Sequence, residues 1–194
     1  CKDARSITVP QGEASKSFKI LESVLRQMLD FGMGRGDLVV AVGGGVVGDL
    51  AGFAASIYMR GIDFINCPTT TLSMIDSSIG GKTAVDLGDT KNIVGAFWQP
   101  KLVIVDPDTL STLPRRHYIN GLAEAVKASL LADPELFAIF EKGDIDAQIG
   151  EIICRSLRFK KGIVEQDETE HGMRKALNFG HTIGHGIEAV KGIK

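Results

Sequence analysis

The chain has 194 residues, 44% of them hydrophobic and 24% charged, so it can bury a sizeable core without disulfide bonds. Its 22 basic and 24 acidic residues leave no basic field, and we expect neither nucleic acid nor a membrane as a partner. The cysteines lie far apart with no CxxC pair, which favours reduced thiols and a cytoplasmic location; they are Cys1, Cys67 and Cys154.

The first part of the chain alternates between strand and helix signals. Residues 37–42 form a continuous apolar run, as expected of a buried parallel strand, and three glycines then precede an apolar helical segment. This alternation predicts an α/β part with a Rossmann-like parallel sheet. The predicted elements are a helix at 15–31 with Phe18, Leu21, Leu25 and Met28 on one face, strands at 37–42, 62–67 and 102–105, and a helix at 46–58.

The second part of the chain is all-helical in pattern. Pro107 and Pro114 bracket the change, and no strand pattern follows them. We therefore predict an α/β domain over residues 1–110 and an all-helical domain over residues 111–194. The expected helices lie at 114–131, 134–141, 145–166 and 174–190.

A glycine-rich segment joins the first strand to the next helix. Gly43, Gly45 and Gly48 match the GxGxxG spacing, in which glycines let the backbone approach a ligand and the helix N-terminus offers N–H groups to a pyrophosphate. A purely structural turn is the alternative. The acidic ribose-binding residue expected about 20 residues later is only loosely matched by Asp63.

Hydroxyl and amino groups follow the second strand. Thr69 and Thr70 lie where the carboxyl end of a parallel strand lines the ligand crevice, although capping of the next helix explains them equally. Lys82 and Lys91 lie near glycines, where an ammonium can meet a phosphate held by backbone amides. Solvated lysines are the alternative to this phosphate site.

The last predicted helix carries a polar stripe. At about 100° per residue, four polar side chains fall within about 60° of one another: Arg174, Asn178, His181 and His185. Two histidines four residues apart can bind one metal, and polar groups on a core helix are costly without partners. Glu124, three residues before Lys127, would complete a His/Glu metal site from another helix. A buried structural histidine and a surface Glu–Lys pair are the alternatives.

These segments, taken in order, resemble the 3-dehydroquinate synthase family of sugar-phosphate cyclases. The matching stretches extend over essentially the whole chain: GEASK, GGGVVGDLAGF, YMRG, PTTTL, DSSIGGKT, KNIVGAFWQP, LPRRHYINGLAEAVK and LNFGHTIGH. The resemblance implies an NAD-binding α/β domain and a helical metal-binding domain, with the site in the cleft between them. It also implies the conversion of 3-deoxy-D-arabino-heptulosonate 7-phosphate to 3-dehydroquinate and phosphate.

The resemblance further implies which residues bind NAD and a divalent metal, zinc or cobalt. Glu124 and His181 match two of the three metal ligands of the family, whose third ligand is a histidine in a segment beyond Lys194. The residues that match cofactor positions are Glu13, Lys16, Gly44, Gly45, Val46, Val47, Gly48, Asp49, Thr69, Thr70, Lys82, Lys91, Thr109, Leu110, Ser111 and Thr112.

A small phosphorylated sugar acid is the substrate that the resemblance implies. Lys160 is preferred to Lys161 as a carboxylate ligand, because it keeps the family's distance to the acidic residues after it. Arg60 matches an arginine that the family donates across a dimer interface, so we expect a homodimer. The residues that match substrate positions are Asp76, Lys82, Asn92, Lys127, Lys160, Arg174, Asn178 and His185.

The family's first strands, its last helices and its third metal ligand have no counterpart here, so we expect an internal portion that releases little phosphate by itself. Three other functions remain open: a metal-dependent polyol dehydrogenase, a sister cyclase with another sugar phosphate, and a non-catalytic NAD- or metal-binding module. The cations that suit a phosphate speak against the dehydrogenase: Arg60, Lys82, Lys91 and Arg174.

Overall fold

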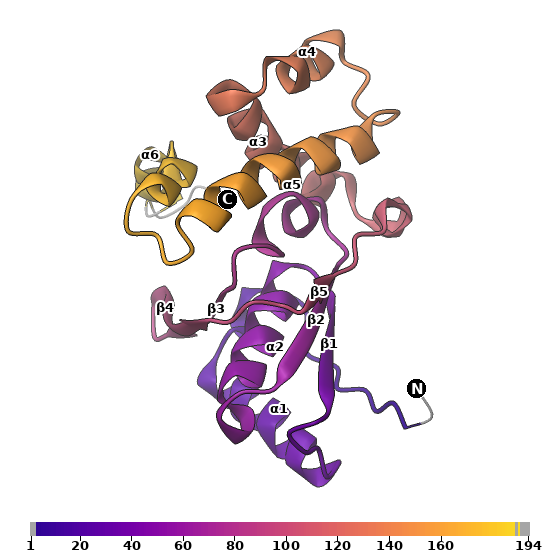
Figure 1. Cartoon of the computed structure of the whole chain (residues 1–194), viewed down its shortest axis with the longest axis vertical. Helices are drawn as coiled ribbons and strands as arrows, with labels where there is room; N and C mark the ends of the chain where they lie inside the picture. The colour runs from indigo at the N-terminus through magenta and orange to yellow at the C-terminus, as the bar shows by residue number, and fades with distance from the viewer. Residues whose placement is uncertain (1–2, 189, 191–194) are drawn as a thin grey trace. The chain divides into compact units, whose positions relative to one another are not determined.

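The structure is a computed structural model that describes residues 3–188 and 190 (Figure 1). The side chains of His185 and Glu188 lie outside the described part. The chain divides into two compact units, Cys1–Leu122 and Ala123–Lys194, and helix α3 (Arg115–Ala132) begins in the first and ends in the second. The domain boundary expected after residue 110 stays a prediction.

A parallel sheet with the order β1–β2–β5 forms the centre of the first unit. A parallel pair needs a crossover connection, and helix α2 supplies the one between β1 and β2. The α/β architecture predicted from the sequence is therefore confirmed. Strand β5 is shorter than expected, because the ladder ends before the 3₁₀ helix Pro107–Thr112. The bounds are β1 Leu38–Gly43, α2 Gly45–Ile57, β2 Asp63–Pro68 and β5 Leu102–Val103.

The core of this unit lies between the sheet and helices α1 (Phe18–Asp30) and α2. The Ser17 side chain caps α1 by accepting the backbone N–H of Ile20. Leu21 and Met28 are buried in α1 as expected, but Phe18 in the first turn is 45% exposed and Val24 is buried. The core residues from the two helices and the sheet are Leu21, Val24, Met28, Leu50, Phe53, Ala54 and Phe64.

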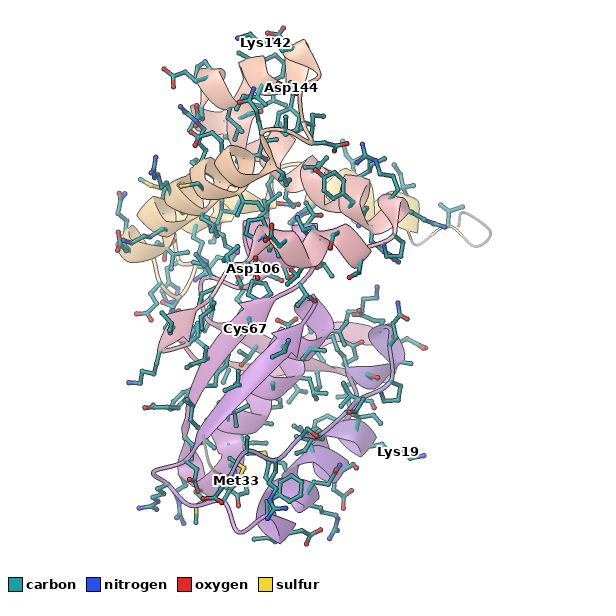
Figure 2. The ribbon with its side chains drawn as sticks, turned by 90° about the vertical axis from the view of Figure 1, so that its right-hand side faces the viewer. Lys19, Met33, Cys67, Asp106, Lys142 and Asp144 are labelled. Carbon is teal, nitrogen blue, oxygen red and sulfur yellow. The ribbon has the colours of Figure 1, made fainter. Side chains whose placement is uncertain are left out.

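The other face of the sheet is also apolar. Val40, Val42, Leu102 and Ile104 keep between 49% and 63% of their surface exposed. Figure 2 shows the strands of this unit toward the viewer, with Cys67 near the carboxyl end of β2. Apolar residues on both faces are typical of parallel strands that are covered on two sides.

An antiparallel hairpin that we had not predicted follows the sheet strand β2. It consists of β3 (Lys82–Leu87) and β4 (Thr90–Phe97), joined by the two-residue turn Gly88–Asp89. We had interpreted this segment only as glycine-flanked lysines. A Gly-Asp pair between runs rich in β-branched residues is a hairpin signal, so the sequence did contain the information.

The second unit is helical, and no strand occurs in its described residues, as predicted. Asp133 caps α4 through the N–H of Leu136, and Gly143 ends that helix in the left-handed conformation with φ 77°. Among the helices of the described residues, none is long and apolar enough to cross a membrane. The further bounds are α4 Pro134–Lys142, α5 Ile149–Gln166, a 3₁₀ helix Met173–Asn178 and α6 His181–Glu188.

The single helix predicted over residues 174–190 is wrong. The 3₁₀ helix ends at Asn178, and Gly180 with φ 83° breaks the chain before α6 begins at His181. A left-handed residue cannot continue a right-handed helix, so residues before and after Gly180 do not share one helical face. Arg174 and Asn178 therefore do not lie on one helical stripe with His181 and His185, contrary to the sequence-based prediction.

Candidate functional site

The N-terminus of α2 offers backbone N–H groups that no side chain caps. Gly44 is the N-cap and has no side chain to accept these bonds. The first turn carries the N–H groups of Gly45, Val46 and Val47, at the positive end of a 13-residue helix. An anion such as a pyrophosphate satisfies such groups, so the geometry fits the cofactor that the motif predicts.

Side chains press closely on this glycine turn. A Cβ atom on Gly44 would lie 3.0 Å from Thr70 Cγ2, and one on Gly45 would lie 3.0 Å from Ser77 Oγ. Ser77 Oγ is itself buried and lacks a hydrogen-bond partner within the described residues. A side chain at either glycine would therefore crowd its neighbour, and the buried Ser77 hydroxyl beside Gly45 is left without a partner among the described residues.

Thr70 makes local capping contacts, which the sequence analysis gave as the alternative to ligand binding. Its backbone N–H donates to Ser73 Oγ at 3.1 Å, and the Ser73 N–H donates to Thr70 Oγ1 at 3.2 Å. These reciprocal bonds close the turn that leads into the short π-helix Ser73–Ser77, which carries Asp76. Thr69 donates its backbone N–H to the Gly43 oxygen at 2.9 Å and so fastens the end of β2 to the glycine turn. Cofactor binding by both threonines stays a prediction.

Lys16 brings together two residues from distant segments. Its ammonium is buried, with 4% of the side chain exposed, and lies 2.7 Å from Asp49 Oδ2 on α2. The same ammonium donates to Asn92 Oδ1 on the β3–β4 hairpin. The structure thus joins two predicted cofactor residues, Lys16 and Asp49, to a predicted substrate residue.

Other predicted residues of this unit lie at the surface or in local hydrogen bonds. Glu13, Lys82 and Lys91 are exposed, and Arg60 is exposed with a left-handed backbone, φ 68°. In the 3₁₀ helix Pro107–Thr112, hydroxyl groups donate to carbonyl oxygens three residues earlier, and Leu110 is buried. The side chains that make these bonds are Thr109, Ser111 and Thr112.

In the second unit, Glu124 lies between an imidazole and an ammonium. His181 Nε2 is 3.6 Å from Glu124 Oε1, and Lys127 pairs with Glu124 Oε2. Lys127 Nζ also donates to the Leu177 carbonyl oxygen at 2.5 Å, which fixes the 3₁₀ helix beside α3. The carboxylate is 21% exposed and the imidazole 42% exposed, so an ion has access to both.

Glu124 and His181 are donors of the kinds that zinc and cobalt accept. Their separation fits the sequence-based expectation that both approach one point. Among the side chains that the structure describes, which leave out those of His185 and Glu188, no group of three His, Cys, Asp or Glu could hold a metal. The pair fits two positions of a metal site, and the role of His185 lies outside the described side chains.

Two cations are buried near the 3₁₀ helix Met173–Asn178. Lys160 on α5 is 8% exposed and Arg174 is 2% exposed. The neighbouring Lys161 is instead at the surface, 3.6 Å from Glu165. The two adjacent lysines thus differ in burial, and the substrate role of Lys160 stays a prediction. Asn178 is exposed and donates to Glu170 Oε1 at 2.6 Å.

Asp167 organises the loop that leads to Arg174. Its carboxylate accepts backbone N–H groups from Arg174, Gly172 and His171, at 3.0, 2.7 and 2.9 Å. These bonds, led by the one from Arg174, lower the pKa of Asp167 to about 2. Arg174 then donates from its guanidinium to the Glu168 carbonyl oxygen. Sequence reasoning missed Asp167, although an Asp at the end of a helical pattern is a known turn signal.

Comparison with known proteins places the chain in a family. Residues 6–120 match the family described as 3-dehydroquinate synthase N-terminal, and residues 121–194 match 3-dehydroquinate synthase C-terminal. A 3-dehydroquinate synthase from Clostridium perfringens strain 13 is 50% identical over 188 residues, which cover 95% of this chain. One from Thermodesulfovibrio yellowstonii is 48% identical over 193 residues, which cover 96%. The chain spans about half of these relatives, 54% of each.

Solved structures agree with this assignment. ValA, a 2-epi-5-epi-valiolone synthase from Streptomyces hygroscopicus with NAD+ and Zn2+ bound, is 32% identical, with a TM-score of 0.88 over 96% of this chain and 55% of that one. A 2-deoxy-scyllo-inosose synthase with carbaglucose-6-phosphate, NAD+ and Co2+ is 31% identical, with a TM-score of 0.80 over 92% and 50%. The chain therefore belongs to the 3-dehydroquinate synthase family.

Proposed function

We propose that the protein containing this chain is a 3-dehydroquinate synthase. It converts 3-deoxy-D-arabino-heptulosonate 7-phosphate to 3-dehydroquinate and phosphate, and it uses NAD and zinc or cobalt. The relatives with this name are about 50% identical, whereas the two cyclases that make other products are 31–32% identical. Because the chain spans only part of those relatives, the proposal concerns the protein at its natural length.

The first turn of α2 would hold the pyrophosphate of NAD. The N–H groups of Gly45 and Val46 point from a helix N-terminus, and Ser77 Oγ lies beside them. NAD would supply a hydride acceptor that is restored within each turnover, so no net oxidation accumulates. Lys16 would neutralise Asp49 next to this turn, because its ammonium is 2.7 Å from that carboxylate.

Glu124 and His181 would hold the metal, which would polarise an oxygen of the substrate as a Lewis acid. Lys127 pairs with the same carboxylate and is anchored by the Leu177 carbonyl. Two contacts fix this ammonium, so it would present a positive charge beside the metal site at little additional entropic cost.

Cations and amides would bind the two anionic ends of the substrate. Lys82, Asn92 and Arg174 would bind the phosphate, together with Arg60 and His185. Lys160 and Asn178 would bind the carboxylate. Charge-assisted hydrogen bonds of this kind are shorter and stronger than neutral ones. Burial of Lys160 and Arg174 strengthens their fields, because water screens them less.

The observation that carries this proposal is the meeting of Glu124, Lys127 and His181. A carboxylate, an ammonium and an imidazole converge although Lys127 and its anchor Leu177 are 50 residues apart. The test is phosphate release from the heptulosonate phosphate, with NAD and zinc or cobalt, by the protein at its natural length. Release of one phosphate per 3-dehydroquinate, without net NADH, is the expected result.

Two adjacent lysines on α5 allow the phosphate-release assay to test the substrate contact of Lys160. Lys160→Met removes the buried cation, and Lys161→Met removes an exposed one from the next position of α5. We expect Lys160→Met to raise KM by about 10-fold or more, since a hydrogen bond to a charged group is worth about 1.5–3 kcal/mol. Lys161→Met should stay within about twofold. An equal change of KM in the two variants would show that Lys160 does not bind the substrate.

A sister cyclase is the second candidate, and the two solved cyclase structures favour it. A sugar phosphate without a carboxylate has no group for Lys160 to bind in this way. Turnover of such a sugar phosphate in preference to the heptulosonate would replace the first proposal with this one. Net NADH formation with a polyol would instead identify a dehydrogenase.

We also propose a homodimer in the cytoplasm. Arg60 supports the dimer, because it is exposed on a turn whose backbone is left-handed at Met59, Arg60 and Gly61. The exposed side chain of Arg60 can therefore contact a partner copy. Light scattering should give twice the monomer mass, and mixing an Arg60→Ala variant with an inactive Glu124→Gln variant should restore activity in the mixed dimer. A monomer at micromolar concentration would rule this out.

A further inference from the structure

The β3–β4 hairpin departs from a regular ladder near its turn. Val85 pairs with Val94 and Leu87 with Thr90, so three residues of β4, 91–93, lie opposite the single residue Asp86. Bulges of this kind bend a strand and re-aim its side chains, and they often lie next to active sites. Asn92, inside the bulge, has a φ of 55°, a left-handed conformation that surrounding contacts must hold.

Asp86 supplies these contacts. Its Oδ1 accepts the backbone N–H of Asn92 at 2.8 Å, in place of a carbonyl oxygen of the ladder. Its own backbone N–H donates to the Lys16 carbonyl oxygen at 2.8 Å, and Asp86 forms an isolated parallel bridge with Ser17. Asp86 therefore ties the bulge to the segment that carries Lys16.

Lys16 then determines how the Asn92 amide is oriented. An ammonium only donates hydrogen bonds, so it must face the amide oxygen, Oδ1. The amide nitrogen Nδ2, which is a donor, lies on the opposite branch of this exposed side chain. The Asp49 carboxylate fixes the ammonium in turn, at 2.7 Å. A donor presented in this way suits an anionic oxygen and not a cation.

We propose that Asp86 is a positioning residue, which acts through Asn92 to present a hydrogen-bond donor to the phosphate of the substrate. The inference rests on the substrate class of the proposed function. Without the Asp86 carboxylate, Asn92 relaxes from the left-handed conformation and its amide leaves the Lys16 ammonium. The phosphate then loses one donor, while the glycine turn at α2 is unchanged.

Three variants test this role in the protein at its natural length. Asp86→Ala removes the acceptor, and Asp86→Asn keeps an acceptor oxygen in the same shape. Asp89→Ala is the matched control, since it removes one carboxylate from the exposed turn of the same hairpin. We expect Asp86→Ala to raise KM for the heptulosonate phosphate about 10-fold, with kcat and the Kd of NAD changed less than about threefold. Asp86→Asn should restore KM to within about threefold, and Asp89→Ala should stay within about twofold.

A double-mutant cycle separates positioning from a general structural effect. If Asp86 acts through Asn92, Asp86→Ala should not raise KM further in an Asn92→Ala background. Additive effects of the two substitutions, or an Asp89→Ala variant as impaired as Asp86→Ala, would overturn the proposal.

NMR tests the positioning of Asn92 by Asp86 independently of the proposed function. If the parent protein releases no phosphate, the proposed function fails, and the side-chain amide resonances of Asn92 then test the positioning alone. Asp86→Ala should shift these resonances and speed their hydrogen exchange about 10-fold more than Asp89→Ala does. Equal shifts in the two variants would refute the role of Asp86.

Discussion

The two units differ in the chemical groups that form their polar sites. In the first unit, the groups that suit a ligand are backbone N–H groups of one continuous segment at the N-terminus of α2. In the second unit, they are side chains from α3 and α6, held by contacts across 50 residues of sequence. A backbone site is sensitive to any added Cβ atom, whereas a side-chain site is sensitive to the loss of one functional group.

Loss of one carboxylate should damage the second unit most. Glu124→Gln removes a predicted metal ligand and the partner of Lys127, so we expect at least about 100-fold lower turnover and 10- to 100-fold weaker zinc binding. Competition with a chromophoric chelator measures the zinc affinity. Glu141→Gln, which removes an exposed carboxylate from α4, is the control and should bind zinc as the parent does.

The second-largest effect should come from a side chain added at the glycine turn of the first unit. In Gly45→Val, the new Cβ atom would lie 3.0 Å from Ser77 Oγ and cover the first turn of α2. We expect NAD binding to weaken about 10- to 100-fold, which corresponds to the loss of one or two charge-assisted hydrogen bonds. Gly150→Val changes the first turn of α5, where no atom lies within 4 Å of the new Cβ, and serves as the control. Unchanged NAD affinity by calorimetry in a folded Gly45→Val variant would contradict the cofactor site.

Two helical glycines should respond oppositely to alanine. In α2, a Cβ atom on Gly52 would lie 2.5 Å from Thr83 Cγ2, so Gly52→Ala should destabilise the protein by about 1–3 kcal/mol. In α5, a Cβ atom on Gly162 meets no atom within 4 Å, so Gly162→Ala should stabilise it by about 0.5–1 kcal/mol. Urea unfolding gives both free energies of unfolding. Stabilisation by Gly52→Ala would show that α2 does not approach Thr83 this closely, and destabilisation by Gly162→Ala would show that the added methyl group is not free of contacts.

The smallest effect should come from pH at the Asp167 loop. The backbone N–H of Arg174, with those of Gly172 and His171, lowers the pKa of Asp167 from 3.8 to about 2. The folded loop thus favours the ionised form: its contribution is complete above about pH 4 and is lost as pH falls through 2. A carboxyl carbon titration by NMR should give a midpoint near 2 for Asp167 in the parent. A midpoint at the ordinary value of 3.8 would mean that these three bonds do not persist in solution.

Elements with a strong period were predictable from the sequence. The apolar run at 37–42 and the glycine turn after it predicted β1 and α2, because a parallel strand and a helix N-terminus have local signatures. The expected burial of this strand is wrong, because Ala41 alone is buried in β1. The hydrogen bonds between Thr70 and Ser73 could not be predicted with certainty, because the same sequence pattern is compatible with capping and with ligand binding.

The C-terminal site was only partly predictable. The i, i+4 histidine spacing and the nearby asparagine and arginine led us to one continuous helix, but Gly180 takes a left-handed conformation and divides it. A glycine in a helical pattern is compatible with either result, because it takes left-handed and right-handed conformations about equally readily. The approach of His181 to Glu124 was nevertheless expected from the residue types that a metal site needs.

The sequence by itself determined which segments are helix and strand where the apolar period is regular, and it carried the motifs of the family in order. Only the tertiary structure decided that the Lys16 ammonium joins Asp49 to Asn92, that Lys160 is buried while Lys161 is exposed, and that Asp86 holds a bulge. The physical reason is the separation along the chain between the residues that interact. Periodicity and capping depend on neighbours within a few residues, whereas burial and ion pairing depend on which distant segments meet.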